Sequence, residues 1–204
     1  MSFQIVSKFE KNIADFFGSP YGVAIDSCTH GIELCLKYLE VDKIRVPKRT
    51  YLSVPMLAKK IGINLDWKDD EWENYYEIDC KKMGMPVHKK LYDAAVLWEE
   101  NSYIEGSFMC LSFQFQKHLS LGRGGMILTD DYDAAHELTQ MSYDGRIPDI
   151  PWTEQNISTM GYHYYMTPET AMLGIDKLPI AIQRKPKEWD VSEWPDLREM
   201  DVFK

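Results

Sequence analysis

The sequence lacks any apolar run near the roughly 20 residues of a membrane-spanning helix. Its first residues, MSFQIVSKFEKN, contain neither an apolar signal core nor a cleavage site. Basic residues are also few relative to acidic ones: the sequence has 23 lysines and arginines and 32 aspartates and glutamates, which gives a formal net charge of −9. This balance argues against non-specific nucleic-acid binding, whereas a small anionic ligand needs only a local site. We therefore expect a cytoplasmic protein that acts on a small molecule, not on a membrane or a nucleic acid.

Cysteine and histidine are few and scattered. The four cysteines form no Cys-x-x-Cys pair, and the five histidines form no His-x-x-x-His pair. The spacing therefore predicts no metal site. We expect four reduced and mostly buried thiols, as is usual in the cytosol.

Strand-like and helix-spaced apolar segments alternate along the 204 residues. The strands are predicted at residues 21–25, 43–46, 63–67, 91–93, 107–115 and 126–129. The helices are predicted near residues 7–17, 32–39, 54–61, 131–141 and 167–178. Residues 68–85 show no clear period. Alternation of this kind predicts an α/β fold, a three-layer α/β/α sandwich around a mainly parallel sheet.

One lysine follows the predicted strand in LSFQFQKHLSLGRGG, residues 111–125. Ser112 lies five residues before Lys117, and glycines follow at 122, 124 and 125. A Schiff-base lysine needs an amine on fixed backbone, desolvated enough to be neutral part of the time. Glycine allows backbone to approach a bulky cofactor. The pattern fits such a site, although a lysine after a strand is more often a solvated surface residue.

A second polar segment, Asp26 to Gly31, joins a predicted strand to a predicted helix. Backbone N–H groups and hydroxyls at a helix N-terminus form a natural seat for phosphate. The alternative is a plain N-cap by Ser27 or Thr29, which needs no ligand.

Asp93 ends a third predicted strand, so an anion seat, a carboxylate and Lys117 all follow strands. In doubly wound sheets, ligands bind at the edge where the parallel strands end. Pyridoxal 5′-phosphate (PLP) requires these three groups: a phosphate seat, a carboxylate for the ring nitrogen, and a lysine for the carbonyl. If the three groups did not meet, the chain would be a generic α/β nucleotide-binding domain.

Six ordered motifs resemble the DegT/DnrJ/EryC1/StrS family of sugar aminotransferases, which are fold-type-I PLP enzymes. The opening helix and strand are similar to the start of the family pattern. Five further segments follow in family order: SCTHGIELCL, VPKRTYLSVP, LYDAA, LSFQFQKHLSLGRGG and GYHYYMTPETAMLGIDKL. The resemblance implies a PLP-dependent aminotransferase acting on a nucleotide-linked keto sugar, with glutamate or glutamine as amino donor. It also implies a homodimer whose sites are completed across the two-fold axis.

The resemblance also implies roles for single residues. Lys117 would form the internal aldimine, and Asp93 would pair with the pyridine nitrogen. Tyr51 would stack on the cofactor ring. The implied phosphate ligands are Cys28, Thr29, Ser112 and, from across the dimer, His163.

Several positions depart from the family pattern. Val96 stands where the family usually has a glutamine, Arg123 replaces the acid of the glycine turn, and His163 replaces an asparagine. Between His88 and Leu91 the chain is shorter than the pattern, so a strand–helix unit is either missing or rebuilt from residues 75–87.

The domain organisation follows from the same comparison. We expect residues 1–182 to form the PLP-binding large domain. Residues 183–204 would be a tail or arm, a remnant of the family's small domain, that either reaches a partner chain or is frayed. Because much of the substrate-binding half is not represented, a second function stays open. The chain could be a non-catalytic relative that binds PLP or a sugar nucleotide, or a subunit or regulator.

Overall fold

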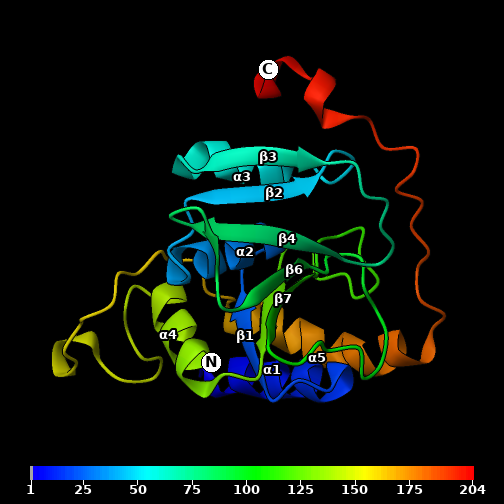
Figure 1. Cartoon of the computed structure of the whole chain (residues 1–204). Helices are drawn as coiled ribbons and strands as arrows, with labels where there is room; N and C mark the ends of the chain where they lie inside the picture. The colour runs from blue at the N-terminus through cyan, green and yellow to red at the C-terminus, as the bar shows by residue number, and fades with distance from the viewer. Residues whose placement is uncertain (1) are drawn as a thin grey trace.

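An eight-stranded mixed sheet organises the computed structural model, which describes residues 2–204 (Figure 1). The strand order is β1-β8-β7-β6-β4-β2-β3, and β5 pairs with β4. Their bounds are β1 Tyr21–Ile25, β2 Lys43–Pro47, β3 Asn64–Lys68, β4 Tyr76–Lys82, β5 Met85–Pro86, β6 Lys90–Asp93, β7 Ser107–Ser112 and β8 Gly125–Thr129.

Most strands of this row share one direction. The pairs β6–β7 and β2–β3 are parallel, whereas β4 and β8 run antiparallel to both of their neighbours in the row. Strands β1, β7, β6, β2 and β3 therefore point the same way. Their carboxyl ends meet at one edge, where the polar segments were expected.

Helices cover both faces of the sheet, which confirms the three-layer α/β fold. They are α1 Gln4–Phe17, α2 Cys28–Tyr38, α3 Ser53–Ile61, α4 Tyr132–Ser142 and α5 Pro168–Gln183. One apolar cluster joins α2, α3 and α4 to one face, and a second joins α1 and α5 to the other. Within residues 2–204, no helix combines the length and apolarity that a bilayer crossing requires.

The segment without a clear sequence period contains the β4–β5 hairpin. Tyr76, Ile78 and Cys80 alternate inward along β4, which inserts antiparallel between β2 and β6. Residues 75–87, for which the sequence left open a missing or a rebuilt strand–helix unit, form a hairpin. One predicted strand was too long, because β7 ends at Ser112 instead of residue 115. The apolar alternation continues through Phe113 and Phe115, but there the chain turns back toward residues 122–124.

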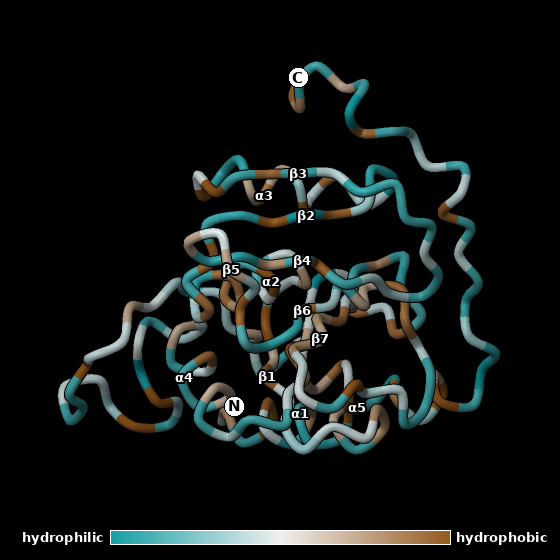
Figure 2. Tube along the Cα trace, viewed as in Figure 1, coloured by the Kyte–Doolittle hydropathy of each residue, from teal (hydrophilic) through white to brown (hydrophobic). Residues whose placement is uncertain are grey.

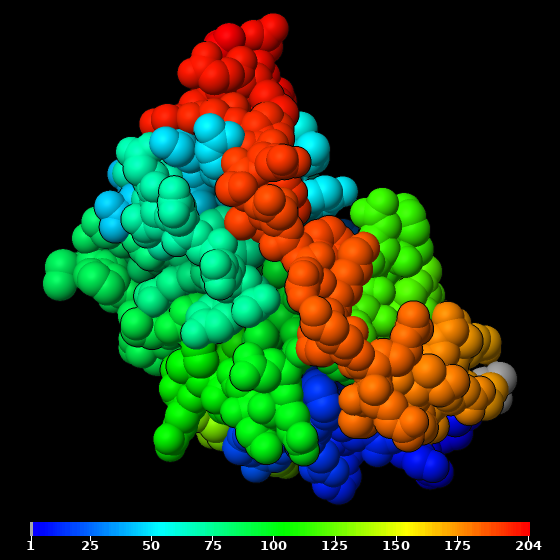
Figure 3. All heavy atoms as spheres, turned by 90° about the vertical axis from the view of Figure 1, so that its right-hand side faces the viewer, coloured from blue at the N-terminus to red at the C-terminus, as the bar shows by residue number. Residues whose placement is uncertain are grey.

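The last segment, residues 184–204, returns from α5 along the surface to the region of β3 (Figures 1 and 3). Figure 2 shows it as mostly hydrophilic chain interrupted by isolated hydrophobic residues. It includes the short helices η2 Leu197–Glu199 and η3 Asp201–Phe203. Leu197 is buried, and its N–H donates to Lys48 O at 2.9 Å. We call this segment the strap.

Candidate active site

Six of the seven predicted site residues line one cavity of about 380 Å³. They are Cys28, Thr29, Tyr51, Asp93, Ser112 and Lys117. Each comes from the carboxyl end of a strand, from the loop that follows it or, for Cys28 and Thr29, from the first turn of α2 after β1. The topology brings these loops together, because β1, β6, β7 and β2 end at the same edge. This convergence contradicts the alternative of a generic nucleotide-binding domain, in which the groups would not meet.

The N-terminus of α2 faces this cavity. Ser27 is the N-cap, and its hydroxyl accepts from His30 N at 3.3 Å, which leaves the first N–H groups of the helix for an anion. The N–H groups of Cys28 and Thr29, in the first turn, have no acceptor within a helix and stay open to an anion. Thr29 Oγ1 donates to Ser53 Oγ at 2.9 Å, which adds a second hydroxyl from α3.

Gly125 allows this turn to sit against the sheet. A Cβ on Gly125 would stand 2.5 Å from Cys28 N and 2.9 Å from Leu111 O, which are backbone atoms that cannot rotate away. Only glycine permits this approach. The second glycine of the pair after Arg123 is therefore required by the path of the α2 turn.

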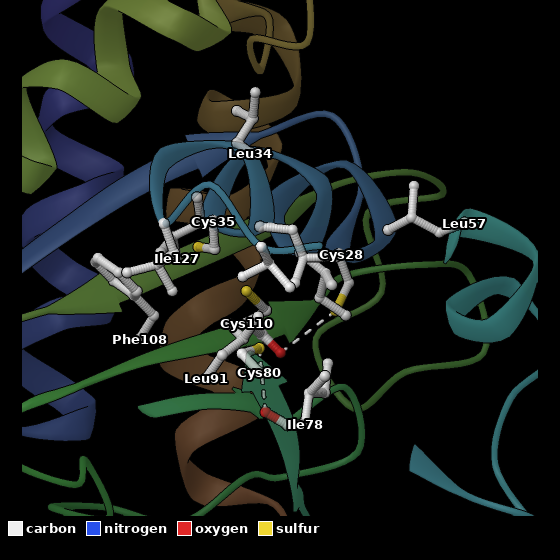
Figure 4. Close-up of a cluster of buried hydrophobic side chains, with 14 of the residues drawn as sticks. Cys28, Leu34, Cys35, Leu57, Ile78, Cys80, Leu91, Phe108, Cys110 and Ile127 are labelled. Carbon is white, nitrogen blue, oxygen red and sulfur yellow. Dashed lines mark hydrogen bonds between the residues drawn. The ribbon is translucent and has the colours of Figure 1, made fainter. Parts of the chain in front are cut away.

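The Cys28 side chain is buried, and Figure 4 shows its sulfur directed toward Cys110 in the core. Its thiol lies 3.3 Å from Cys110 O and 3.9 Å from Asp93 Oδ1. Burial and then the Asp93 charge raise the pKa of the Cys28 thiol well above its ordinary value. Cys28 can therefore offer a ligand only its backbone N–H. All four cysteines are free and buried, as predicted.

Asp93 is a buried carboxylate held by three donors. Ala95 N donates to Oδ1 at 3.0 Å, Tyr76 Oη donates to Oδ2 at 2.9 Å, and the Cys28 thiol lies near Oδ1. Burial raises the pKa of Asp93, and these bonds and the Lys117 charge oppose the rise. A cation placed beside Asp93 would favour its ionised form. Sequence reasoning missed Tyr76, which lies in the segment without a clear period.

Lys117 lies in the turn between β7 and β8, where its N–H donates to Gln114 O at 2.8 Å. Its ammonium stands 4.4 Å from the centre of the Trp189 ring. Burial lowers the pKa of Lys117, opposed by the Cys28 and Asp93 charges and assisted by Lys187. The amine is therefore neutral more often than a surface lysine, which a nucleophilic role requires.

Of two further predicted residues, Tyr51 lies at the cavity and His163 does not. Tyr51 borders the cavity and is 57% exposed, so its ring is free to contact a ligand. His163 does not line the cavity. It has a positive φ of 55°, and its Nδ1 lies 2.9 Å from Asp144 Oδ2. Because His163 was expected to act across a dimer, its role stays a prediction.

Two of the departures from the family pattern, at positions 96 and 123, lie at the cavity. Val96 contributes an apolar side chain to the wall. Arg123 pairs with Asp26 Oδ2 at 2.8 Å, just ahead of the α2 N-cap. Trp189 and Trp194 of the strap complete the lining, and sequence reasoning did not assign them. The only signal for them was the tryptophan-rich composition of the tail.

Comparison with known proteins identifies the family of the chain. The DegT/DnrJ/EryC1/StrS aminotransferase family model matches residues 2–96 and 104–190. The chain belongs to this family. A curated relative is GDP-perosamine synthase of Caulobacter vibrioides, 22% identical, with 86% of this chain and 56% of that protein covered. The chain covers 56–58% of the length of the first curated relatives that it matches.

Solved structures show the same fold. The sugar aminotransferase CalS13 from Micromonospora echinospora superposes with a TM-score of 0.72 at 13% identity, covering 87% of this chain and 60% of that one. Spr1654 from Streptococcus pneumoniae, in its PLP form, superposes with a TM-score of 0.69 at 19% identity, covering 86% and 59%.

Proposed function

We propose that this chain is a PLP-dependent aminotransferase that acts on a nucleotide-linked keto sugar, with glutamate or glutamine as amino donor. One observation supports it above the others: the Lys117 amine, the Asp93 carboxylate and the open N-terminus of α2 border one cavity. Residues 1–182 would form the cofactor domain of such an enzyme.

The residues present fit the cofactor. An anion matches the N–H groups of Cys28 and Thr29, with the hydroxyls of Ser27 and Ser112 at the same cavity wall. A protonated ring nitrogen matches Asp93, whose burial otherwise makes its charge unfavourable. An exposed aromatic face at Tyr51 matches a planar ring.

Bound PLP would supply an electron sink for the carbon that loses a proton. The chain supplies the other parts. Neutral Lys117 would attack a carbonyl carbon, whose oxygen leaves as water. Once the donor's amine has displaced it, Lys117 would accept a proton from the carbon on one side of that nitrogen and return it to the carbon on the other side. Asp93 would keep the ring nitrogen protonated, because a cation in contact stabilises its buried carboxylate. The aromatic walls exclude water from the Lys117 amine.

A cofactor titration tests the proposal. Wild-type protein mixed with PLP should develop a visible absorbance band that Lys117→Ala removes. Lys8→Ala, an exposed lysine on α1, is the matched control and should keep the band. Addition of glutamate should then bleach the band and release one keto acid per site. A wild-type protein that stays colourless with PLP would refute the assignment.

A second candidate function rests on Val96. Its apolar side chain stands at the cavity wall where the family resemblance leads us to expect an amide. A non-catalytic relative that binds PLP would show the absorbance band without any response to glutamate or glutamine, and one that binds only a sugar nucleotide would show binding of that ligand without the band. A full transamination cycle would exclude it.

The remaining assignments are part of the same proposal. We expect a homodimer in which His163 reaches the partner's phosphate seat, and sedimentation of purified protein tests the dimer. A cytoplasmic location fits four free thiols. Fractionation of cells that express the full protein tests the location.

A further inference from the structure

The strap contacts the residues on both sides of Lys117. Lys187 N donates to His118 Nδ1 at 3.2 Å, and Lys187 Nζ donates to Gln116 O at 2.9 Å. Strap residue 187 therefore holds the turn at residues 116 and 118. The lysine between them carries the amine that faces the cavity.

His118 connects this contact to α5. Its Nε2 lies 2.8 Å from Ala181 O, which can only accept, so Nε2 carries the proton and donates. Nδ1 is then free to accept from Lys187 N. The ring is neutral in this arrangement, and it joins the end of α5, the strap and the Lys117 turn.

Trp189 follows two residues later and covers the amine. Its ring centre lies 4.4 Å from Lys117 Nζ and 4.2 Å from Lys187 Nζ. A carbon atom bonded to Lys117 Nζ on the side of the ring would come within contact distance of the indole. Trp189 is half-buried and belongs to the cavity lining, so its face is turned toward the site.

Further along, the strap is fixed at the opposite side of the cavity. Arg49 donates to Trp194 O, and the Trp194 ring lies 5.9 Å from that of Trp72 and 6.5 Å from that of Tyr51. Figure 3 shows the strap running over the surface between these two ends. The segment that carries Trp189 is thus held at both ends.

We propose that Trp189 is a positioning residue that packs against the group joined to Lys117, and that the strap forms the outer wall of the site. The inference rests on the proposed function, because it needs a carbonyl ligand on Lys117. A segment that only covered the surface would not be expected to bond to residues 116 and 118 and also to place an indole over the Lys117 amine. An aromatic face here slows release of the ligand and keeps water from the amine.

The test compares Trp189→Ala, Trp189→Phe and the control Trp152→Ala, an exposed tryptophan outside the cavity. Each protein is loaded with PLP and mixed with an excess of a PLP-requiring apoenzyme, and release of PLP is followed by the activity that this apoenzyme gains. We expect Trp189→Ala to release PLP about tenfold faster, since a packed aromatic group contributes about 1.4 kcal/mol or more. Trp189→Phe should be slower than Trp189→Ala, and Trp152→Ala should match wild type.

A second measurement needs no cofactor. Acylation of Lys117 by an amine reagent, read by peptide mass spectrometry, should be faster in Trp189→Ala than in wild type, with unchanged labelling of Lys8. Thermal unfolding of each variant checks that it is folded.

Equal PLP release from wild type, Trp189→Ala and Trp189→Phe would overturn the role of Trp189 while leaving the proposed function intact. Equal acylation of Lys117 would overturn the cover itself. Absence of a visible band in wild type would instead refute the proposed function, and the role of Trp189 in holding a cofactor with it.

Discussion

Tyr76 Oη donates to Asp93 Oδ2 at 2.9 Å and accepts from Thr50 Oγ1 at 2.8 Å. This series of hydrogen bonds runs from the loop after β2, through β4, to the end of β6. All three residues are buried. The antiparallel hairpin strand therefore supplies a donor that holds the site carboxylate, so β4 has a role in the site as well as in the sheet.

Removal of this donor should be costly and pH-dependent. Tyr76→Phe leaves Oδ2 short of a partner, so we expect a loss of about 1.5–3 kcal/mol of unfolding free energy near neutral pH. The pKa of Asp93, already raised by burial, rises further without this bond. A carboxyl whose pKa is higher in the folded protein contributes its full stability while it is protonated in both the folded and the unfolded state. That contribution is lost as pH rises through the folded-state pKa.

The loss in Tyr76→Phe should therefore be smaller in acid than at neutral pH. Urea unfolding over a pH series measures it. The exposed neighbour Tyr75 provides the control Tyr75→Phe, which should follow wild type. A loss that does not vary with pH would show that Tyr76 acts through packing alone.

Gly125→Ala should displace the α2 turn. The new methyl would meet Cys28 N, Ser27 C and Leu111 O at 2.5–2.9 Å, so backbone must move. We expect a loss of about 1–3 kcal/mol in stability and weaker affinity for PLP, measured by calorimetry and by absorbance titration.

Gly31→Ala is the control within α2. Its methyl would meet only side-chain atoms, at 3.2 Å or more, so little change is expected. Wild-type PLP affinity in Gly125→Ala would mean that the turn does not hold the phosphate.

Much of the site follows from short local patterns. Ser27, Asp93 and Lys117 each follow a strand, and the carboxyl ends of strands of one direction meet at one edge. Local residue order therefore predicts which groups share a cavity. The strand that ends at Ser112 was overestimated because the Phe113 and Phe115 alternation continues into the turn.

The missed residues depend on contacts between distant parts of the chain. Tyr76 reaches Asp93 only because β4 inserts between β2 and β6. No local pattern in the sequence predicts this insertion. Trp189 lies over Lys117 because Lys187 bonds to Gln116, 71 positions earlier. The strap has little regular structure and no apolar period, so its path follows only from the folded chain.

Strap attachment should depend on one buried side chain. Leu197 is 2% exposed, and Leu197→Ala removes most of its apolar contact, at about 2 kcal/mol or more. The strap is a surface segment, so this loss should appear as local opening instead of global unfolding. We expect faster hydrogen exchange in peptides from residues 184–204 and unchanged exchange in β7 and β8.

Val202→Ala, at an exposed strap position, is the control and should leave exchange as in wild type. If Leu197→Ala exchanges as slowly as wild type, the strap is held by its other contacts.

Glu10 links α1 to the edge strand β1 and should control stability at alkaline pH. Its Oε1 accepts from Ala24 N at 2.9 Å, on a strand that pairs only with β8 in the row. Burial raises the pKa of Glu10 to about 7, although the Ala24 bond opposes the rise. The stability that the protonated group contributes is complete below its unfolded-state pKa, near 4.5, and is lost as pH rises through about 7.

Glu10→Gln keeps an oxygen acceptor for Ala24 N and cannot ionise. The variant should therefore match wild type in acid and exceed it above pH 7, by at most about 3 kcal/mol. Urea unfolding at intervals between acid and alkaline pH measures the difference. Glu137→Gln, at an exposed position on α4, should follow wild type throughout. Parallel curves for wild type and Glu10→Gln would mean that the Glu10 carboxylate is solvated in the folded protein and that the edge of β1 tolerates its charge.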